Sequence, residues 1–93
     1  MDNATQSEVE KVARILLQAG AREVFLFGSA AHGKERAESD LDLAVRGLPP
    51  ERFFVAMSAI AFAISVPFDL IDLDDKNPFT NYLETEGELL RVA

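Results

Sequence analysis

Apolar and polar residues occur along the chain in blocks whose spacing predicts both helices and strands. Between residues 9 and 17, apolar side chains recur at the spacing of one helix face, at Val9, Val12, Ala13, Leu16 and Leu17. Ser7 and Glu10 fit a capping box that would start this helix, and Gly20 would end it. Residues 23–27 are rich in β-formers and are followed by a glycine, which is typical of a strand.

The rest of the chain continues the alternation of element types. The blocks predict, in order, a strand at 40–46, a helix from 50 to about 65, a strand at 66–73, a helix from 78 to about 87 and an apolar tail at 89–92. Pro50 and Pro78 suit first helical positions, and Asn77 would cap the last helix. The tail is either an edge strand or a strap against the core.

This order of elements favours an α/β (α+β) fold in a single domain, 1–93. We expect a small mixed sheet of three or four strands with helices mainly on one face. The second strand requires such an arrangement, because side chains alternate between the two faces of a strand. Leu41, Leu43 and Val45 must be buried, whereas Asp40 and Asp42 point the other way and must not be.

The composition limits the cellular compartment in which we expect the protein. The chain has 93 residues and no cysteine, which excludes disulfides and thiolate metal sites and favours the cytoplasm. The polar N-terminus does not resemble a signal peptide, and the longest apolar stretch, 53–68, is interrupted and too short for a bilayer span. We therefore expect no membrane association.

The net charge of −7 bears on partners. Domains that grip DNA or RNA carry basic faces, so direct nucleic-acid binding is not expected. A nucleotide held through Mg²⁺ remains compatible with this charge, because the metal supplies positive charge locally. An acidic chain is also suited to a basic protein partner.

One stretch combines a turn suited to phosphate with a pair of acidic residues. Gly28 and Ser29 form the turn, and Asp40 and Asp42 follow on one face of the expected second strand. Neighbouring carboxylates repel each other without a cation between them. Hard oxygen ligands suit Mg²⁺, which completes its shell with substrate phosphates. The stretch therefore predicts nucleotide chemistry.

A third carboxylate is expected from the third strand. Asp69 and Asp72 are an odd number of residues apart, so a regular strand places them on opposite faces. Only one can face the first pair, and we choose Asp69, which lies between Phe68 and Leu70 in an awkward place for a structural carboxylate. Asp72 is then expected to be structural, as a loop cap.

Several of these motifs together resemble the polymerase-β-like nucleotidyltransferase superfamily. They are Gly28-Ser29, Gly33, Ser39-Asp40-Leu41-Asp42-Leu43 and Phe68-Asp69-Leu70-Ile71. The small size and the closing residues 82–90 look like its minimal branch, the MNT proteins. The resemblance extends from about residue 10 to the end of the chain.

The resemblance implies roles for the matching positions. Gly28 and Ser29 would hold the nucleotide phosphates. Asp40, Asp42 and Asp69 would bind Mg²⁺ and form the catalytic set, with Asp69 helping to activate the acceptor hydroxyl. ATP would be the co-substrate.

The loop departs from the family pattern at two positions. Family members often carry arginine where this chain has Ala30 and His32. Lys34 and Arg36 lie on the same loop and are candidates to contact the triphosphate instead. Ser39 completes the expected nucleotide-binding residues.

The resemblance also implies a partner. MNT proteins are typically antitoxins of HEPN-type toxins, and the implied activity is transfer of AMP from ATP to a tyrosine hydroxyl of the toxin. The alternative is a non-catalytic antitoxin that neutralises its toxin by binding. A third reading is transfer to a small molecule such as an aminoglycoside. Because so small a domain cannot enclose both substrates, we expect a stable partner or a homodimer.

Overall fold

The computed structural model describes the backbone of residues 3–28, 41–87 and 89–93, and side chains within these ranges from residue 6 onward. Three helices and four strands follow one another in these ranges. They are α1 (Asn3–Gln18), β1 (Glu23–Phe27), β2 (Leu41–Arg46), α2 (Pro50–Ala63), β3 (Phe68–Asp72), α3 (Pro78–Thr85) and β4 (Leu90–Arg91). No helix in the described part of the chain is both long and apolar enough to cross a bilayer.

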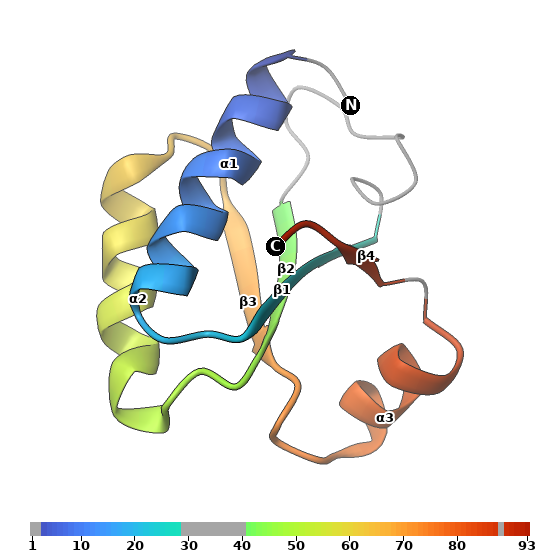
Figure 1. The fold of residues 1–93 in the computed structure, drawn as a ribbon. Coiled ribbons are helices and arrows are strands. Elements are labelled where there is room, and N and C mark those ends of the chain that lie inside the picture. Colours follow the sequence, from blue (N-terminus) through green and yellow to red (C-terminus); the bar gives the residue numbers. More distant parts are fainter. Residues whose placement is uncertain (1–2, 29–40, 88) are drawn as a thin grey trace.

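The strands form one mixed sheet in the order β3-β2-β1-β4 (Figure 1). β1 pairs with β2 and with β4 in antiparallel fashion, while β2 and β3 run parallel and are connected through α2. The parallel pair matters for function, because it brings the same ends of β2 and β3 to one edge of the sheet. β4 shows that the apolar tail is an edge strand.

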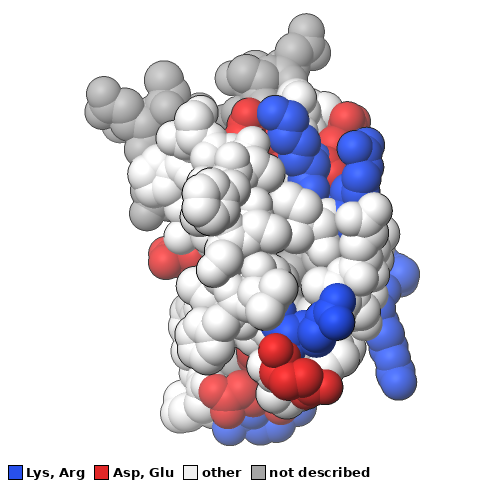
Figure 2. All heavy atoms as spheres, turned by 90° about the vertical axis from the view of Figure 1, so that its left-hand side faces the viewer, with Lys and Arg blue, Asp and Glu red and all other residues white. Residues whose placement is uncertain are grey.

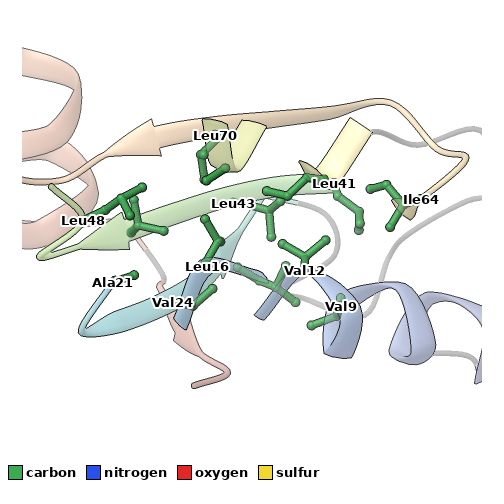
Figure 3. Close-up of a cluster of buried hydrophobic side chains, with 14 residues drawn as sticks. Val9, Val12, Leu16, Ala21, Val24, Leu41, Leu43, Leu48, Ile64 and Leu70 are labelled. Atoms are coloured by element: carbon green, nitrogen blue, oxygen red, sulfur yellow. The ribbon is translucent and has the colours of Figure 1, made fainter. Parts of the chain in front are cut away.

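Helices α1 and α2 cover one face of the sheet and α3 lies on the other side (Figure 1). Alternate residues of β2 point into the layer below α1 and α2, where Leu41, Leu43 and Val45 are buried with Leu16 and Ile60 (Figure 3). Fully burying one such side chain contributes about 1.5–3 kcal/mol. This layer therefore fixes the register that sends the intervening residues of β2 to the opposite face.

Helix α3 closes part of that opposite face. Leu83 packs there with Phe25, Ala44 and Leu73 in a second, smaller cluster. From the sequence, helices were expected mainly on the other face, with carboxylates on this one. Instead one end of it is core, because α3 has an apolar stripe of its own to bury. The other end of the face carries the acidic residues.

The expected fold class is confirmed, and so is the capping of α3. Asn77 accepts hydrogen bonds from the backbone N–H groups of Phe79 and Thr80, and Pro78 occupies the first turn. The expected start of α1 was wrong: the helix begins at Asn3, so Ser7 lies inside it. A cap is worth only about 1 kcal/mol and does not exclude further helical turns ahead of it.

Candidate active site

Two carboxylates lie side by side where the parallel strands begin. Asp42 of β2 is the direct neighbour of Asp69 of β3. Paired residues of adjacent strands project from the same face, so both side chains stand on the face opposite α1 and α2. Asp42 is half-buried and Asp69 is exposed. Neighbouring negative charges repel each other, and two hard oxygen donors in this position suit a divalent cation.

Gly28 reaches this pair from β1. It follows Phe27, which is paired with Asp42 across the antiparallel ladder, and its φ of 72° lies in the left-handed region. A Cβ atom at Gly28 would overlap Oδ2 of Asp42. Backbone and carboxylate therefore meet at a distance that only glycine allows.

Asp72 lies on the other face of the sheet. Its neighbour on β2 is Val45, a core residue, and its Oδ1 accepts a hydrogen bond of 2.9 Å from the N–H of Asp74. Asp72 thus closes the turn after β3. The strand therefore brings Asp69, and not Asp72, next to Asp42, and the two residues lie on opposite faces as their odd spacing predicted.

Several predicted residues cannot be placed. Those that lie outside the described residues are Ser29, Ala30, His32, Lys34, Arg36, Ser39 and Asp40. Within the ranges that the structure describes, no group of three or more acidic or histidine side chains could hold a metal. The described part of the site is thus Gly28, Asp42 and Asp69, and the functional roles of all the named residues stay predictions.

Aromatic residues beside this site had no role in the sequence interpretation. Phe27 contacts Phe79 of α3 edge to face, with 6.1 Å between ring centroids. Phe79 and Tyr82 are one turn apart on α3 and are 48% and 54% exposed. The sequence offered the helical spacing of Phe79 and Tyr82 as a signal, but their position over β1 depends on how α3 folds back.

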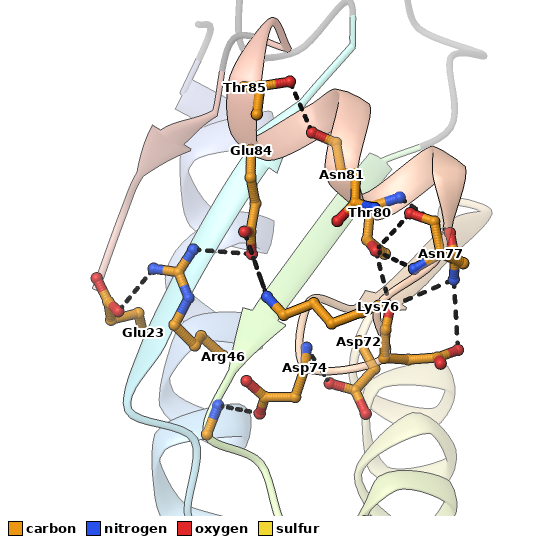
Figure 4. A network of polar contacts seen from close by, with 12 residues as sticks. Glu23, Arg46, Asp72, Asp74, Lys76, Asn77, Thr80, Asn81, Glu84 and Thr85 are labelled. Atoms are coloured by element: carbon orange, nitrogen blue, oxygen red, sulfur yellow. Dashed lines mark hydrogen bonds and ion pairs between the residues drawn. The ribbon is translucent and has the colours of Figure 1, made fainter.

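The other end of the same face is held by a network of ion pairs (Figure 4). Arg46 donates to Glu23 at 2.9 Å and to Glu84 of α3 at 3.2 Å, and its guanidinium lies 5.3 Å from the Phe25 ring centroid. Lys76 also donates to Glu84, at 3.2 Å. Hydrogen bonds from Arg46 and then Lys76 lower the pKa of Glu84, and the hydrogen bond to Glu23 raises the pKa of Arg46. This network ties α3 to the sheet.

Comparison with known proteins identifies the family. The model for "Polymerase beta, Nucleotidyltransferase" matches residues 10–91 of this chain. Since this match spans nearly the whole chain, the protein belongs to the polymerase-beta nucleotidyltransferase family, and the resemblance drawn from its motifs is confirmed. No curated protein is similar enough in sequence to count as a match.

Solved structures share the fold. A structure described as a candidate minimal nucleotidyltransferase is 26% identical, with a TM-score of 0.73 and 95% of each chain covered. A toxin–antitoxin crystal structure with AMP-PNP contains a chain 24% identical, with a TM-score of 0.68, over 86% of this chain and 69% of that one. A complex of tri-AMPylated Shewanella oneidensis HEPN toxin with MNT antitoxin gives 22% identity and a TM-score of 0.64, over 90% and 69%.

Proposed function

We propose that this protein is a Mg²⁺-dependent nucleotidyltransferase that transfers AMP from ATP to a tyrosine hydroxyl of a HEPN-type toxin and so acts as its antitoxin. The observation that carries the proposal is the pairing of Asp42 with Asp69 beside Gly28. The family supports nucleotidyl transfer. The partner is suggested by the toxin–antitoxin complexes that share the fold.

The acidic pair fits the metal that such chemistry uses. Asp42 and Asp69 would hold Mg²⁺ together with Asp40, which precedes β2 by one residue. Carboxylate oxygens are the ligands that Mg²⁺ takes from proteins alongside substrate phosphates. When bound, the metal supplies positive charge to the triphosphate and lowers the pKa of an attacking hydroxyl.

The chain's own residues account for the remaining steps. A tyrosine hydroxyl has a pKa of about 10 and is a weak nucleophile at neutral pH. The exposed Asp69 carboxylate is available to accept its proton as general base. The phenolic oxygen then bonds to the α-phosphorus, the bond from this phosphorus to the α,β-bridging oxygen breaks, and pyrophosphate leaves.

The phosphates would lie along the turn after β1. Gly28 lets the backbone approach the carboxylates closely, and Ser29 would add a hydroxyl. Ser39, Lys34 and Arg36 are proposed to contact the nucleotide from the loop, the last two in place of the arginines absent at positions 30 and 32.

A partner surface is available on α2. Its outer side exposes Phe54, Val55 and Phe62 to 76%, 63% and 93%. The exposed residues between them are small, namely Ser58, Ala59 and Ala61. Figure 2 looks onto this side and shows a broad area without charged side chains. Phe53, by contrast, packs partly against the core. Of the two adjacent phenylalanines, Phe54 is therefore the exposed one.

The toxin is the occupant we propose for this surface. Two phenylalanines of roughly 150–250 Å² each supply much of the roughly 800 Å² that a stable interface buries per partner. A second copy is disfavoured, because both chains would carry a charge of −7.

The test separates chemistry from binding with two variants. Asp42→Asn should still bind the toxin but should neither AMPylate nor neutralise it. Phe62→Glu should weaken toxin binding, measured by calorimetry. If Asp42→Asn neutralises the toxin as well as the parent does, the alternative of a binding-only antitoxin is correct. If Phe62→Glu binds the toxin normally, α2 is not the docking surface.

A further inference from the structure

A hollow of about 290 Å³ lies between the end of β1 and α3. Among the described residues it is lined by Phe27, Gly28, Phe79, Tyr82, Leu83, Glu86 and Gly87. Its volume is at the small end of the range for ligand pockets, which suits a single ring system rather than a whole nucleotide. Nothing in the function proposed above uses this hollow.

The hollow adjoins the acidic pair. Phe27, in its wall, is the direct neighbour of Asp42 across the ladder, and Gly28, also in its wall, touches the Asp42 carboxylate. Phosphates held at Gly28 and a metal held at Asp42 and Asp69 would thus lie at one end of the hollow. A group attached to those phosphates through a sugar would reach its interior.

The walls offer aromatic surface to a flat ligand. Phe27 and Phe79 meet edge to face, which fixes the two rings relative to each other. Tyr82 adds a ring that is more than half exposed. Base stacking on such rings tolerates every nucleobase, because each base has a π-face.

The rim adds a polar group and a constrained backbone. Gly87 follows α3 so tightly that a Cβ there would come within 2.6 Å of Leu83 Cα, so this wall is formed by backbone. Glu86, next to it, carries a carboxylate, whose oxygens accept hydrogen bonds. An amino group on the base is therefore the matching partner.

We infer that this hollow is the nucleobase subsite of the protein, with the base stacked on Tyr82 and its exocyclic amino group donating to Glu86. The subsite takes adenine in preference to uracil, which has no amino group. The inference rests on the proposed function, since it needs the triphosphate at Gly28 and the acidic pair.

A direct test uses fluorescence, because Tyr82 is the single tyrosine and the chain has no tryptophan. Its emission reports on one residue. Mg²⁺-ATP should change this emission saturably, whereas Mg²⁺-tripolyphosphate, which has no base, should bind without changing it. If the Tyr82 emission changes equally with both ligands, the inference is wrong. It is also wrong if ATP binds and the emission does not change.

Calorimetry with variants provides the second test. Tyr82→Ala should weaken Mg²⁺-ATP binding about tenfold or more and leave Mg²⁺-tripolyphosphate binding unchanged. Glu86→Ala should remove most of an ATP-over-UTP preference of about tenfold. Leu17→Ala, which changes an exposed apolar residue on α1, is the control and should alter the binding of neither ligand.

The outcomes distinguish the two proposals. If AMP transfer proceeds while ATP and tripolyphosphate bind equally well to the parent protein, the subsite is wrong and the function stands. If neither Mg²⁺-ATP nor Mg²⁺-tripolyphosphate binds, the subsite and the proposed function are both wrong. If Tyr82→Ala weakens toxin binding but not ATP binding, the hollow receives the partner rather than the base.

Discussion

Acidic residues have different neighbours at the two ends of one face of the sheet. At the α3 end, Glu23 and Glu84 receive hydrogen bonds from Arg46, and Glu84 also receives one from Lys76. At the other end, Asp42 and Asp69 are placed next to each other. Residues on one side of the same strand, β2, therefore lie at both ends of this face. The ion pairs hold α3 to the sheet, while the adjacent acids are the pair that we propose to bind a cation.

The largest expected effect is the loss of ATP affinity when Mg²⁺ is removed, and it should depend on the acidic pair and not on the α3 end. A phosphate charge about 4 Å from a carboxylate is repelled, and at an effective dielectric constant of 20 this repulsion costs about 4 kcal/mol. Without the metal, ATP should therefore bind more than about a hundredfold more weakly, as measured by calorimetry with and without a chelator. Arg46→Met, at the opposite end, should keep the full dependence. Equal ATP affinity in both conditions would exclude the metal site.

Removing the guanidinium at the α3 end should affect stability instead. Arg46→Met keeps the aliphatic stem but loses two ion pairs and the contact with Phe25. We expect the free energy of unfolding to fall by about 1–2 kcal/mol in urea denaturation, with AMP transfer unchanged.

The matched control for this change is Lys11→Met. Lys11 forms an ion pair with Glu8 at 3.8 Å on the surface of α1. Its loss should cost less than about 0.5 kcal/mol. An equal loss for both variants would mean that the network at the α3 end has no special role.

Lowering the pH should produce the smallest of these effects, through Glu84 at the α3 end. Hydrogen bonds from Arg46 and Lys76 hold the pKa of Glu84 below its ordinary value of 4.5. Because the folded-state pKa is depressed, this contribution to stability is complete above pH 4.5 and is lost as pH falls through the lower folded value. The stability difference between the parent and Arg46→Met should therefore be constant above that pH and shrink below it. A difference that grows on acidification would contradict the pairing.

Local patterns predicted more of the fold than of the site. β1 has its expected bounds, because its β-rich block ends at a glycine that must adopt positive φ. Strand parity separated Asp69 from Asp72, the apolar neighbours Phe68 and Leu70 favoured Asp69, and the register places Asp69 beside Asp42. Both inferences depend only on residues close together in the sequence.

Features that depend on distant packing were beyond the sequence. The position of α3 over Phe25 and Ala44, and hence the hollow beside Phe27, follows from how the chain folds back after β3. The same applies to the exposure of Tyr82. Leu83 is 39 positions from Ala44 and 58 from Phe25, and no local spacing encodes such contacts.

The central claim is that Asp69, beside Asp42, is the general base of AMP transfer. Mass spectrometry of the toxin after incubation with ATP and each variant tests it most directly. Asp69→Asn should still bind ATP but lose transfer by roughly two orders of magnitude or more. Asp72→Asn, on the opposite face, should add AMP at nearly the parent rate. If Asp72→Asn abolishes the mass increase and Asp69→Asn does not, the account of the site is wrong.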